Sequence, residues 1–501
     1  MTSPAVLQSP LEGRANPSMW FQGDGCGPSR ARWAWRREGG CDYPVGRESL
    51  SIGNMFIHAA RGEYLHLTDN ARTTTRRYVM QSAYGNQTPP VATELTNVEA
   101  GSPMGELLRR YWQPVCTSDE LKDLPRKEKL LCEEVVLFRD GSGKVGALKP
   151  HCSHRGTSLE WGRVEERGLR CCFHGWLYAT DGRCLEMPCE TDEFRERMNV
   201  WQPAYPALEF GGLVFVYMGP PGTEPEFPIY DIIDSQVVGE VELRGMRLWD
   251  DQGIGYVKDC NWLQHYENVV DPWHLIMLHQ VISGNQGHNM LEGMTENMLA
   301  RDMAKIEFEK RPTGVRFNMV RELPNGDYFV RHAECIVPNA YVVPAVSHDG
   351  GRKTRATELS WAVPIDNEHV RGISMVAWPL ENGKPKAGWR PGTDISDEVR
   401  PGAALSRSYE ERQRKPDDRE AQEGQRTTAV HALENLGMSD TGVVLLRRML
   451  REQLKRLEQG LDPMNIVRDK SAARGIPTGT WNAILSASEA AALGDKVGRL
   501  A

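Results

Sequence analysis

The fold of this chain is decided by two short stretches, Cys152-Ser153-His154-Arg155-Gly156 and Cys171-Cys172-Phe173-His174-Gly175-Trp176, with sixteen residues between His154 and Cys171. Each stretch supplies one thiol and one imidazole, and each has a glycine shortly after its histidine. We expect both stretches to be turns that follow strands, because glycine lets the backbone approach bound sulfur atoms closely. The pattern therefore predicts a metal site with two thiolate and two imidazole ligands.

Two thiolates and two imidazoles are the ligand set of a Rieske-type 2Fe-2S cluster, in which the cysteines hold one iron and the histidines hold the other. We therefore predict Cys152, His154, Cys171 and His174 as the cluster ligands. The alternative is a tetrahedral zinc site built from the same side chains. Glycine-flanked loops that each carry a cysteine before a histidine favour the cluster, and Cys172 does not fit the ligand count.

A second polar group lies about a hundred residues further on, in Glu267-x3-Asp271-x2-His274-x4-His279. Two neutral imidazoles and one carboxylate bind ferrous iron on one face and leave three positions open, as in non-haem iron oxygenases. Residues five apart on a regular α-helix point about 140° apart, so His274 and His279 can share an ion only where the helix ends or distorts. Taken alone, Asp271 before Pro272 is typical of a helix N-cap.

The chain resembles the large, oxygenase subunit of the Rieske non-haem iron aromatic-ring hydroxylating oxygenases, and is most similar to their phthalate dioxygenase-like branch. The resemblance extends from about Gly101 to Gly460. It is carried by the two cysteine–histidine loops, by the Glu267–His279 pattern and by Gly105-Glu106-Leu107-Leu108-Arg109-Arg110-Tyr111-Trp112-Gln113-Pro114-Val115.

This resemblance implies roles for the second polar group. His274 and His279 would bind a mononuclear Fe(II), and Asp271 would bridge His274 to His174 of the partner subunit in a homotrimer, carrying electrons across the interface. We place Asn268 beside Asp271 among the catalytic residues. Phthalate-type relatives often carry glycine at the position of Asn268, and Glu-Asn before the aspartate is similar to relatives that demethylate lignin-derived methoxyarenes.

The third iron ligand has to come from far along the chain. The family places it in an Asp-x3-Gln-Glu run before the final long helix, and Asp418-Arg419-Glu420-Ala421-Gln422-Glu423-Gly424-Gln425 matches this run. The resemblance therefore implies that Asp418 is the third ligand. Asp417 and Glu423 are the nearest competitors, and acidic residues after Pro416 would also favour the N-terminus of a helix.

Charge and composition exclude several classes of function. The chain has 501 residues, with 60 Lys+Arg against 68 Asp+Glu, and it has no strongly basic block, so we expect no binding to nucleic acid or to an anionic membrane. It has no run of eighteen apolar residues and no secretory pattern at the start, which predicts a soluble, cytoplasmic protein. Eleven cysteines, an odd number, suit a reducing compartment and metal binding.

The chain divides into segments of different character. Residues 1–97 have no helical or alternating pattern, so we expect a disordered extension or a start codon placed too far upstream, with Met80 as the alternative start. We expect an α+β fold, in which an all-β Rieske domain over residues 98–222 precedes a catalytic domain over residues 223–462. The catalytic domain would be an antiparallel sheet covered by helices, similar to a helix-grip fold, and residues 463–501 would be a weakly patterned tail.

Local signals predict individual elements. Ser102 and Pro103 are typical of the start of a short helix. The apolar run Leu130–Phe138 predicts a strand, and Asp140–Gly143 predicts the hairpin turn that follows it. The last clear element is an amphipathic helix over Ser439–Glu458.

The resemblance implies the oxygenase component of a multicomponent system. Such a protein would hydroxylate or O-demethylate a small aromatic substrate, such as an aromatic acid, with O2 and electrons from NAD(P)H. No Gly-x-Gly-x-x-Gly fingerprint opens a strand-to-helix turn, so we expect the reductase, with or without a ferredoxin, to be a separate polypeptide. The alternatives are a Rieske electron-transfer protein with a non-catalytic second domain and a zinc-stabilised binding protein.

Overall fold

The computed structural model divides the chain into two units, Met1–Asn86 and Gln87–Ala501. It describes residues 63–64, 76–77, 83, 86–247, 257–283, 305–344, 353–387 and 407–493. In the first unit, β1 (Glu63–Tyr64) pairs antiparallel with β2 (Arg76–Arg77). The disorder expected over residues 1–97 falls mostly on residues outside the described ranges. Residues 87–97 belong to the second unit, where Leu95 is buried.

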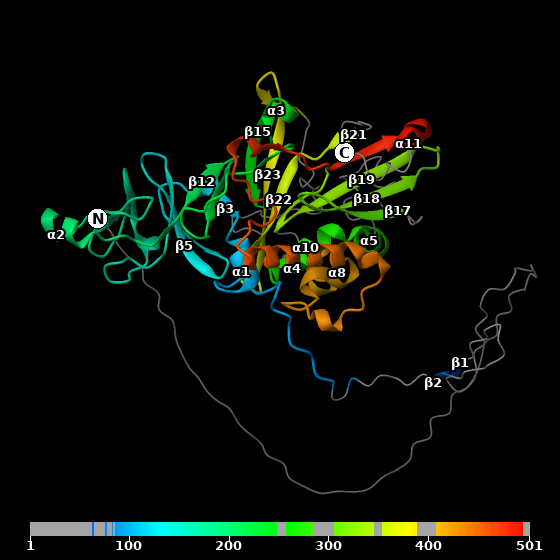
Figure 1. Cartoon of the computed structure of the whole chain (residues 1–501), viewed down its shortest axis with the longest axis horizontal. Helices are drawn as coiled ribbons and strands as arrows, with labels where there is room; N and C mark the ends of the chain where they lie inside the picture. Colours follow the sequence, from blue (N-terminus) through cyan, green and yellow to red (C-terminus); the bar gives the residue numbers. More distant parts are fainter. Residues whose placement is uncertain are drawn as a thin grey trace, which may run out of the picture. The chain divides into compact units, whose positions relative to one another are not determined.

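Three small antiparallel sheets, whose strands lie between Trp112 and Tyr217, build the N-terminal lobe of the second unit (Figure 1). The first sheet holds β7 (Arg163–Glu165), β8 (Gly168–Arg170), β9 (Leu177–Tyr178) and β10 (Cys184–Glu186). The second holds β4 (Arg126–Leu130), β5 (Glu133–Arg139), β6 (Val145–Leu148) and β11 (Ala204–Tyr205). The third holds β3 (Trp112–Thr117), β12 (Ala207–Phe210) and β13 (Leu213–Tyr217). The lobe's helices are short: α1 (Pro103–Leu108), η1 (Ser118–Glu120), η2 (Leu159–Trp161) and α2 (Asp192–Met198).

The start of α1 confirms the predicted cap. The Ser102 hydroxyl accepts a hydrogen bond from the Gly105 N–H at 3.2 Å, and Pro103 occupies the first helical position. Proline fits there because the first N–H groups of a helix have no intrahelical partner. The hairpin turn predicted at Asp140–Gly143 is also present, between β5 and β6.

The single strand predicted over Leu130–Phe138 is wrong in one respect, because it is broken by a two-residue turn. Leu131 and Cys132 have φ values of 50° and 66°, so β4 folds back directly into β5. Such turns favour Asn-Gly, and nothing in Leu-Cys signals one. The conformation is held from outside the hairpin, since the Leu131 and Cys132 N–H groups donate to the carbonyls of Pro364 and Ile365 in the C-terminal lobe.

The C-terminal lobe is built on an eleven-stranded sheet with the main order β15-β23-β22-β20-β19-β18-β17. These strands are β15 (Val241–Arg247), β17 (Lys305–Lys310), β18 (Gly314–Glu322), β19 (Tyr328–Ile336), β20 (Ala340–Val342), β22 (Glu358–Pro364) and β23 (Val370–Glu381). The others are β16 (Val257–Lys258), β21 (Lys353–Arg355), β24 (Lys384–Pro385) and β26 (Trp481–Leu485). The sheet and its helices bear out the predicted α+β class.

Helices gather along one face of this sheet, where α4, α5, α8 and α10 lie together (Figure 1). Around the site the chain forms α4 (Trp262–Glu267), η3 (Asn268–Val270), α5 (Pro272–Ile276), the π-helix η4 (Met277–Ile282), α8 (Tyr409–Arg414), α9 (Asp418–Glu423) and α10 (Thr441–Glu458). Elsewhere it forms α3 (Ser235–Val238), η7 (His431–Leu433), η8 (Met438–Asp440), η9 (Lys470–Ala472) and α11 (Ala487–Leu493). None of the described helices has both the length and the apolar character that crossing a bilayer requires.

The predicted final helix is confirmed as α10, and it packs closely on the sheet. Leu446, Met449 and Leu450 are fully buried along one side of it. A Cβ added at Gly442 would lie 2.4 Å from the Phe308 ring and 2.4 Å from the Val270 carbonyl oxygen. Glycine is therefore required there, because α10 approaches both β17 and η3 too closely for a side chain.

Residues after Pro463 differ from the weakly patterned tail that the sequence suggested. The strand β26 pairs antiparallel with the first half of β19, from Tyr328↔Leu485 to Arg331↔Asn482. The shorter β25 (Arg474–Ile476) pairs parallel with β14 (Ile229–Tyr230). Both partners lie far away in the sequence, so neither pairing leaves a local pattern from which it could be predicted.

Glu334, near the C-terminal end of β19, makes the stability of the lobe depend on pH. Its side chain is fully buried, and one oxygen accepts a hydrogen bond from the Thr313 hydroxyl. Burial raises its pKa from 4.5 to about 7, against the opposing effect of Thr313. A carboxyl that binds its proton more tightly when folded stabilises the fold below its unfolded pKa, and that stability is lost as the pH rises through about 7.

We expect Glu334→Gln to remove this loss, because the amide stays neutral. The wild-type protein should lose up to about 3 kcal/mol between pH 4.5 and pH 8 that the variant keeps, since one pKa unit corresponds to about 1.4 kcal/mol. Thermal melting of both proteins at pH 5 and pH 8 measures the difference. Parallel pH dependence in the two proteins would contradict the assignment.

Candidate metal centres

The two cysteine–histidine loops fold in the same way. Each follows directly on a strand region, after β6 or β8, and each is closed by two backbone hydrogen bonds. The cysteine N–H donates to the carbonyl five residues later, and a glycine four residues after the cysteine donates back to the cysteine carbonyl. Those glycines, Gly156 and Gly175, have φ values of 75° and 73°, a conformation that glycine adopts without strain.

The donor atoms of the loops converge in a way that fits a bound cluster. Cys152 and Cys171 are 3% and 4% exposed, and their thiols interact with each other. The rings of His154 and His174 lie edge to face, with centroids 4.5 Å apart. The Nδ1 atom of His174 is buried with no hydrogen-bond partner. A buried nitrogen without a partner is unfavourable, and a metal ion would satisfy it.

The spacing of the loop donors disfavours the zinc alternative. Ligands of one zinc ion lie within about 4.6 Å of one another, since zinc–sulfur and zinc–nitrogen bonds are about 2.3 and 2.0 Å long. Within the described ranges, the group of three or more such side chains whose ligand atoms all lie within 4.8 Å of one another is His274, His279 and Asp418. The loop donors do not form such a group. A cluster with two irons, each holding two of the four ligands, suits their wider spacing.

Two aromatic residues that are not among the predicted ligands contact them. The Trp176 ring stacks on His154 at 4.4 Å with an angle of 8° between the planes. The Tyr178 hydroxyl lies 3.1 Å from the Cys152 sulfur. Burial raises the pKa of Cys171, and the backbone N–H groups of Phe173 and His174 oppose this shift. Hydrogen bonds to the sulfurs are one means by which a protein sets the reduction potential of a cluster.

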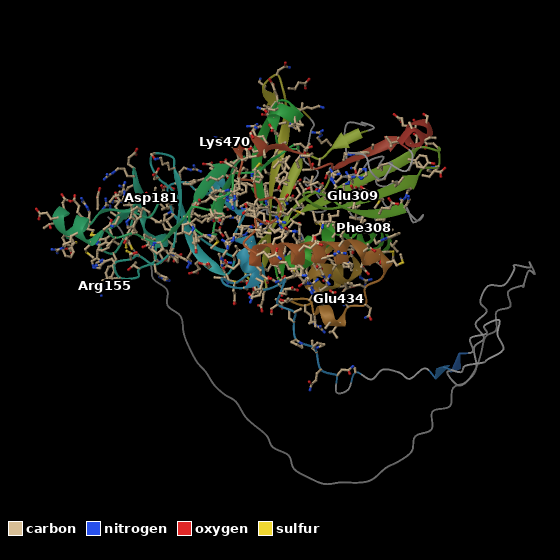
Figure 2. The ribbon with its side chains drawn as sticks, in the orientation of Figure 1. Arg155, Asp181, Phe308, Glu309, Glu434 and Lys470 are labelled. Atoms are coloured by element: carbon tan, nitrogen blue, oxygen red, sulfur yellow. The ribbon has the colours of Figure 1, made fainter. Side chains whose placement is uncertain are left out.

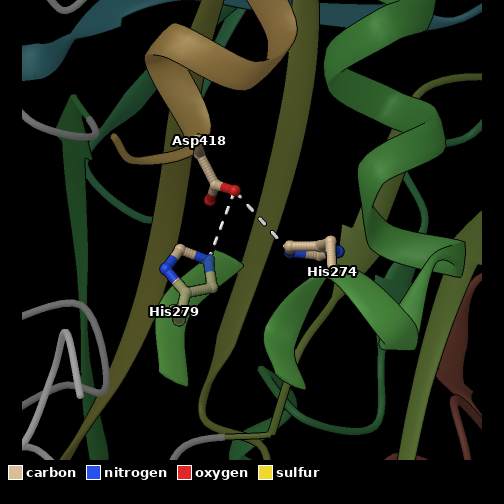
Figure 3. A group of neighbouring side chains, drawn as sticks. All are labelled: His274, His279 and Asp418. Carbon is tan, nitrogen blue, oxygen red and sulfur yellow. Dashed lines mark ion pairs between the residues drawn. The ribbon is translucent and has the colours of Figure 1, made fainter. Parts of the chain in front are cut away.

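The second group of predicted residues comes together between three helical segments (Figure 3). His274 lies on α5, His279 on η4 and Asp418 at the start of α9. The Nε2 atoms of His274 and His279 lie 3.6 and 3.4 Å from the same oxygen, Asp418 Oδ1. Two imidazoles and one carboxylate with converging atoms can hold an iron ion on one face.

The helix distortion that the spacing of the histidines requires is present as a π-helix. The chain changes from α5 to η4 at Met277, between His274 and His279. A π-helix hydrogen-bonds residues five apart, so residues at that spacing lie above one another and do not diverge as they would on an α-helix. The hydroxyl of Ser283, at the end of η4, donates to the carbonyl of Pro416, which ties this segment to the start of α9.

The structure separates Asp418 from its two competitors. Asp417 is the N-cap of α9, where its Oδ1 accepts from the Arg419 N–H at 2.8 Å. Glu423 accepts from the Asp259 N–H at 2.9 Å and lies 3.0 Å from the Arg419 guanidinium. Of the three acids, only Asp418 is grouped with the two histidines.

His274 is oriented by its own helix cap. Its Nδ1 donates to the backbone carbonyl of Asp271, which leaves Nε2 as the acceptor that faces Asp418. A metal-binding histidine commonly has its other nitrogen fixed in this way. The Asp271 carboxylate caps α5 by accepting from the Trp273 N–H at 3.2 Å, and its second oxygen lies 3.9 Å from His274 Nδ1. Its side chain is 36% exposed, so the carboxylate can be reached from outside the lobe.

Asn268 joins two members of the group. Its Nδ2 donates to Asp418 Oδ1 at 3.2 Å and lies 3.3 Å from His274 Nε2. A glycine at this position would provide neither contact. The amide therefore helps to fix the carboxylate and stands beside the nitrogen that would bind a metal.

Buried polar side chains that the sequence did not indicate as site residues form hydrogen bonds that hold α9 in place. The Lys258 ammonium donates to Gln422 Oε1 at 2.6 Å and lies 3.1 Å from His265 Nδ1. Gln422 is one helical turn after Asp418, so this contact positions the helix that carries the carboxylate. Burial raises the pKa of Asp418, but the two histidines of the group and Lys258 outweigh it and hold this pKa well below its usual value. The carboxylate is therefore ionised and able to bind a cation.

Comparison with known proteins agrees with this geometry. Residues 111–206 match the family described as the Rieske [2Fe-2S] domain. The phenoxybenzoate dioxygenase subunit alpha of Ectopseudomonas oleovorans is 37% identical over 401 residues, which cover 77% of this chain and 90% of the relative. The chain belongs to the Rieske non-haem iron oxygenases.

Two other members are also similar over 77% of this chain. The tert-butanol monooxygenase / tert-amyl alcohol desaturase oxygenase subunit of Aquincola tertiaricarbonis is 38% identical over 80% of its length, and the 5,5'-dehydrodivanillate O-demethylase oxygenase subunit of a Sphingobium species is 32% identical over 85%.

Oxygenase subunits of this family carry a Rieske 2Fe-2S cluster and a mononuclear iron, and the donor sets of this chain fit both groups. The four loop residues supply two thiols and two imidazoles, one of which has an unpartnered buried nitrogen. His274, His279 and Asp418 supply the donors for a single ion. The chain is thus an oxygen-incorporating oxidoreductase subunit, as the sequence predicted.

Glu267, the first residue of the sequence motif in this Rieske oxygenase, lies in a buried ion pair at the end of α4. Its two oxygens accept from Arg447 on α10 at 2.5 and 2.7 Å, and Arg447 also lies 2.5 Å from Glu434. Burial raises the pKa of Glu267, and Arg447 opposes this shift. The pair fixes α4 to α10, next to the segment that carries the histidines.

We expect Arg447→Met to destabilise the oxygenase by about 3–5 kcal/mol, because it leaves Glu267 buried without its cation. Urea denaturation measures the free energy of unfolding. The double variant Arg447→Met with Glu267→Gln is the matched control, and it should recover part of the loss because no buried charge remains. A loss below about 1 kcal/mol in the single variant would mean that the pair is solvated.

Proposed function

We propose that this chain is the terminal oxygenase of a multicomponent system that oxidises a small aromatic substrate with O2 and electrons from NAD(P)H. The observation that carries the proposal is the group of His274, His279 and Asp418, which occurs in the same chain as a Rieske ligand set. An electron carrier needs only the Rieske ligand set. The proposed oxygenation needs the Rieske ligand set and the mononuclear iron site together.

The proposed ligand roles follow from the donor atoms. Cys152 and Cys171 would hold one iron of the cluster, and His154 and His174 would hold the other. The Nε2 atoms of His274 and His279 and the carboxylate of Asp418 would hold the mononuclear iron. When bound, the cluster supplies electrons and the iron supplies open positions for dioxygen. The protein orients these groups, with Asn268 and the Asp271 carbonyl fixing two of the ligands.

We further propose that the active assembly is a homotrimer in which electrons pass between chains. Arg155, beside the predicted ligand His154, is labelled in the N-terminal lobe, whereas Phe308 is labelled beside the helices of the C-terminal lobe (Figure 2). The two proposed centres of one chain therefore lie in different lobes. Asp271, which is partly exposed, would bridge His274 to His174 of the partner subunit.

The names of the relatives support a separate electron donor and leave the reaction type open. Each relative is named as one subunit of its enzyme, so we propose a separate NAD(P)H-dependent reductase, with or without a ferredoxin, as the partner. Two of these relatives are named after aromatic compounds. One of the two is named a dioxygenase and the other an O-demethylase. We therefore propose an aromatic substrate that is hydroxylated or O-demethylated.

The test is a coupled assay with the full chain, a family reductase, NADH and a panel of benzoates and methoxybenzoates under ¹⁸O2. We expect a product whose formation needs all components and which carries the label or has lost a methyl group as formaldehyde. A chain that accepts electrons into its cluster but forms no oxidised product with any aromatic compound would be an electron carrier, and the proposal would fail.

A further inference from the structure

One buried arginine of the C-terminal lobe has no acidic partner. Arg331, on β19, is 4% exposed, and among the described residues it forms no ion pair. Its Nη1 donates to the Asn482 side chain at 3.3 Å and to the Pro344 carbonyl at 3.4 Å. Its Nε is buried with no hydrogen-bond partner, and no hydrogen bond from Nη2 to a described residue is formed. Nε and Nη2 are the two donors that together hold a carboxylate side-on.

Six other buried arginines in the described part of the chain each contact a glutamate: Arg109, Arg247, Arg316, Arg371, Arg419 and Arg447. Arginine is seldom buried without such a partner, because an uncompensated charge in the interior is unfavourable. Burial alone lowers the pKa of Arg331 to about 10, so the side chain is still a cation at neutral pH. The position therefore holds a buried positive charge that a bound anion would neutralise.

The register of the sheet puts Arg331 on the face that carries the proposed iron site. Alternate residues of a strand share a face, so Arg331 and Cys335 point to the same side of β19. The Cys335 thiol donates to the Tyr266 carbonyl on α4 at 3.6 Å. Tyr341, which pairs with Cys335, has its hydroxyl 3.3 Å from His265, a neighbour of Gln422 on α9.

The distance along the strand suits a small aromatic molecule. Arg331 lies four residues from Cys335, which corresponds to about 13 Å along an antiparallel strand. A compound with one or two rings can span from the region of the histidines to the guanidinium over this length. The intervening position on this face is Ala333, which is buried and small.

We infer that Arg331 binds the carboxylate of the substrate, so that the substrates of this enzyme are aromatic carboxylates whose reacting end lies toward His274, His279 and Asp418. This inference rests on the proposed function, because it places the ligand in the same site. Arg331 would act by binding and orientation. Its guanidinium would neutralise the acid group and set which end of the molecule faces the histidines.

The test compares benzoate, 3-methoxybenzoate and 3-phenoxybenzoate with their primary amides. Binding to the full, metal-loaded chain is measured anaerobically by calorimetry, so that no turnover is needed. We expect the wild type to bind each acid at least about 10-fold more tightly than its amide. Arg331→Gln should weaken binding of the acids by about 10- to 100-fold and leave binding of the amides unchanged, because a charged hydrogen-bonded pair is lost.

Two further variants separate charge from packing. Arg331→Lys keeps the positive charge but loses the planar pair of N–H donors that holds a carboxylate side-on. This variant should retain part of the preference for the acid. Met319→Leu changes the residue directly opposite Arg331 on β18 without changing charge, so the ratio of acid to amide binding should stay as in the wild type. If Arg331→Gln does not fold, the wild-type ratio and Arg331→Lys still decide the question.

Equal binding of acid and amide by the wild type, or equal weakening of both in Arg331→Gln, would overturn the assignment of a carboxylate site. The coupled assay distinguishes this outcome from failure of the proposed function. An enzyme that oxidises neutral aromatic compounds but does not prefer acids would be an oxygenase without this site. A chain that oxidises no aromatic compound at all would overturn the proposed function itself.

Discussion

Asp271→Asn is expected to lower coupled product formation by at least about 100-fold while both metal centres stay filled. The reason is the position of the carboxylate, which caps α5 with one oxygen and lies 3.9 Å from His274 Nδ1 with the other. A carboxylate there can hold two imidazoles in the required tautomer and couple their protonation to the redox state of the cluster. An amide has no charge with which to do so.

Asparagine is chosen because it caps helices as well as aspartate does, so α5 and the orientation of His274 should be retained. The measurements are NADH-dependent product formation and the rate at which the reduced cluster is reoxidised by O2 in the presence of substrate. Both should fall together, with unchanged iron and sulfide content. Wild-type turnover in Asp271→Asn would leave only the cap function for this residue.

Asp418→Ala should have the other large effect, with loss of the mononuclear iron and a fall in product formation of more than about 100-fold. Its Oδ1 is the atom on which both histidines converge, and no other acid of the described residues lies in the group. The cluster is built from residues of the other lobe, so its visible spectrum and reduction by dithionite should stay as in the wild type.

The neighbouring Asp417→Ala is the matched control. Asp417 caps α9 and lies 2.8 Å from Arg407, so its removal should reduce stability by about 1 kcal/mol without loss of iron. If Asp417→Ala lost the iron and Asp418→Ala retained it, the ligand would have been misassigned between two adjacent residues.

Much of the architecture around the proposed centres could be predicted because it depends on local spacing. Each loop contains both a thiol and an imidazole within four residues, so the pattern is complete before folding. His274 and His279 are close enough in the sequence to show that the helix between them must distort, and η4 is that distortion. Asp418 is far away in the sequence, and only the resemblance to a family pointed to it.

Other features depend on contacts between distant segments and could not be predicted. The turn at Leu131 and Cys132 is held by carbonyls of Pro364 and Ile365. The strand β26 exists because β19 offers it an edge. Lys258 and Gln422 come into contact only in the folded chain. The position of Arg331 on the sheet face that the helices cover is likewise set only by folding. In each case the partner that fixes the conformation is more than a hundred residues away or has no sequence signal of its own.

Iron and acid-labile sulfide counts on three purified proteins test the central claim most directly, namely that one chain holds two separate iron centres. The wild type should contain about three irons and about two sulfides per chain, Asp418→Ala about two irons and two sulfides, and Cys152→Ser about one iron and no sulfide. A colourless wild type that binds zinc, or an Asp418→Ala protein that keeps all its iron, would contradict the account.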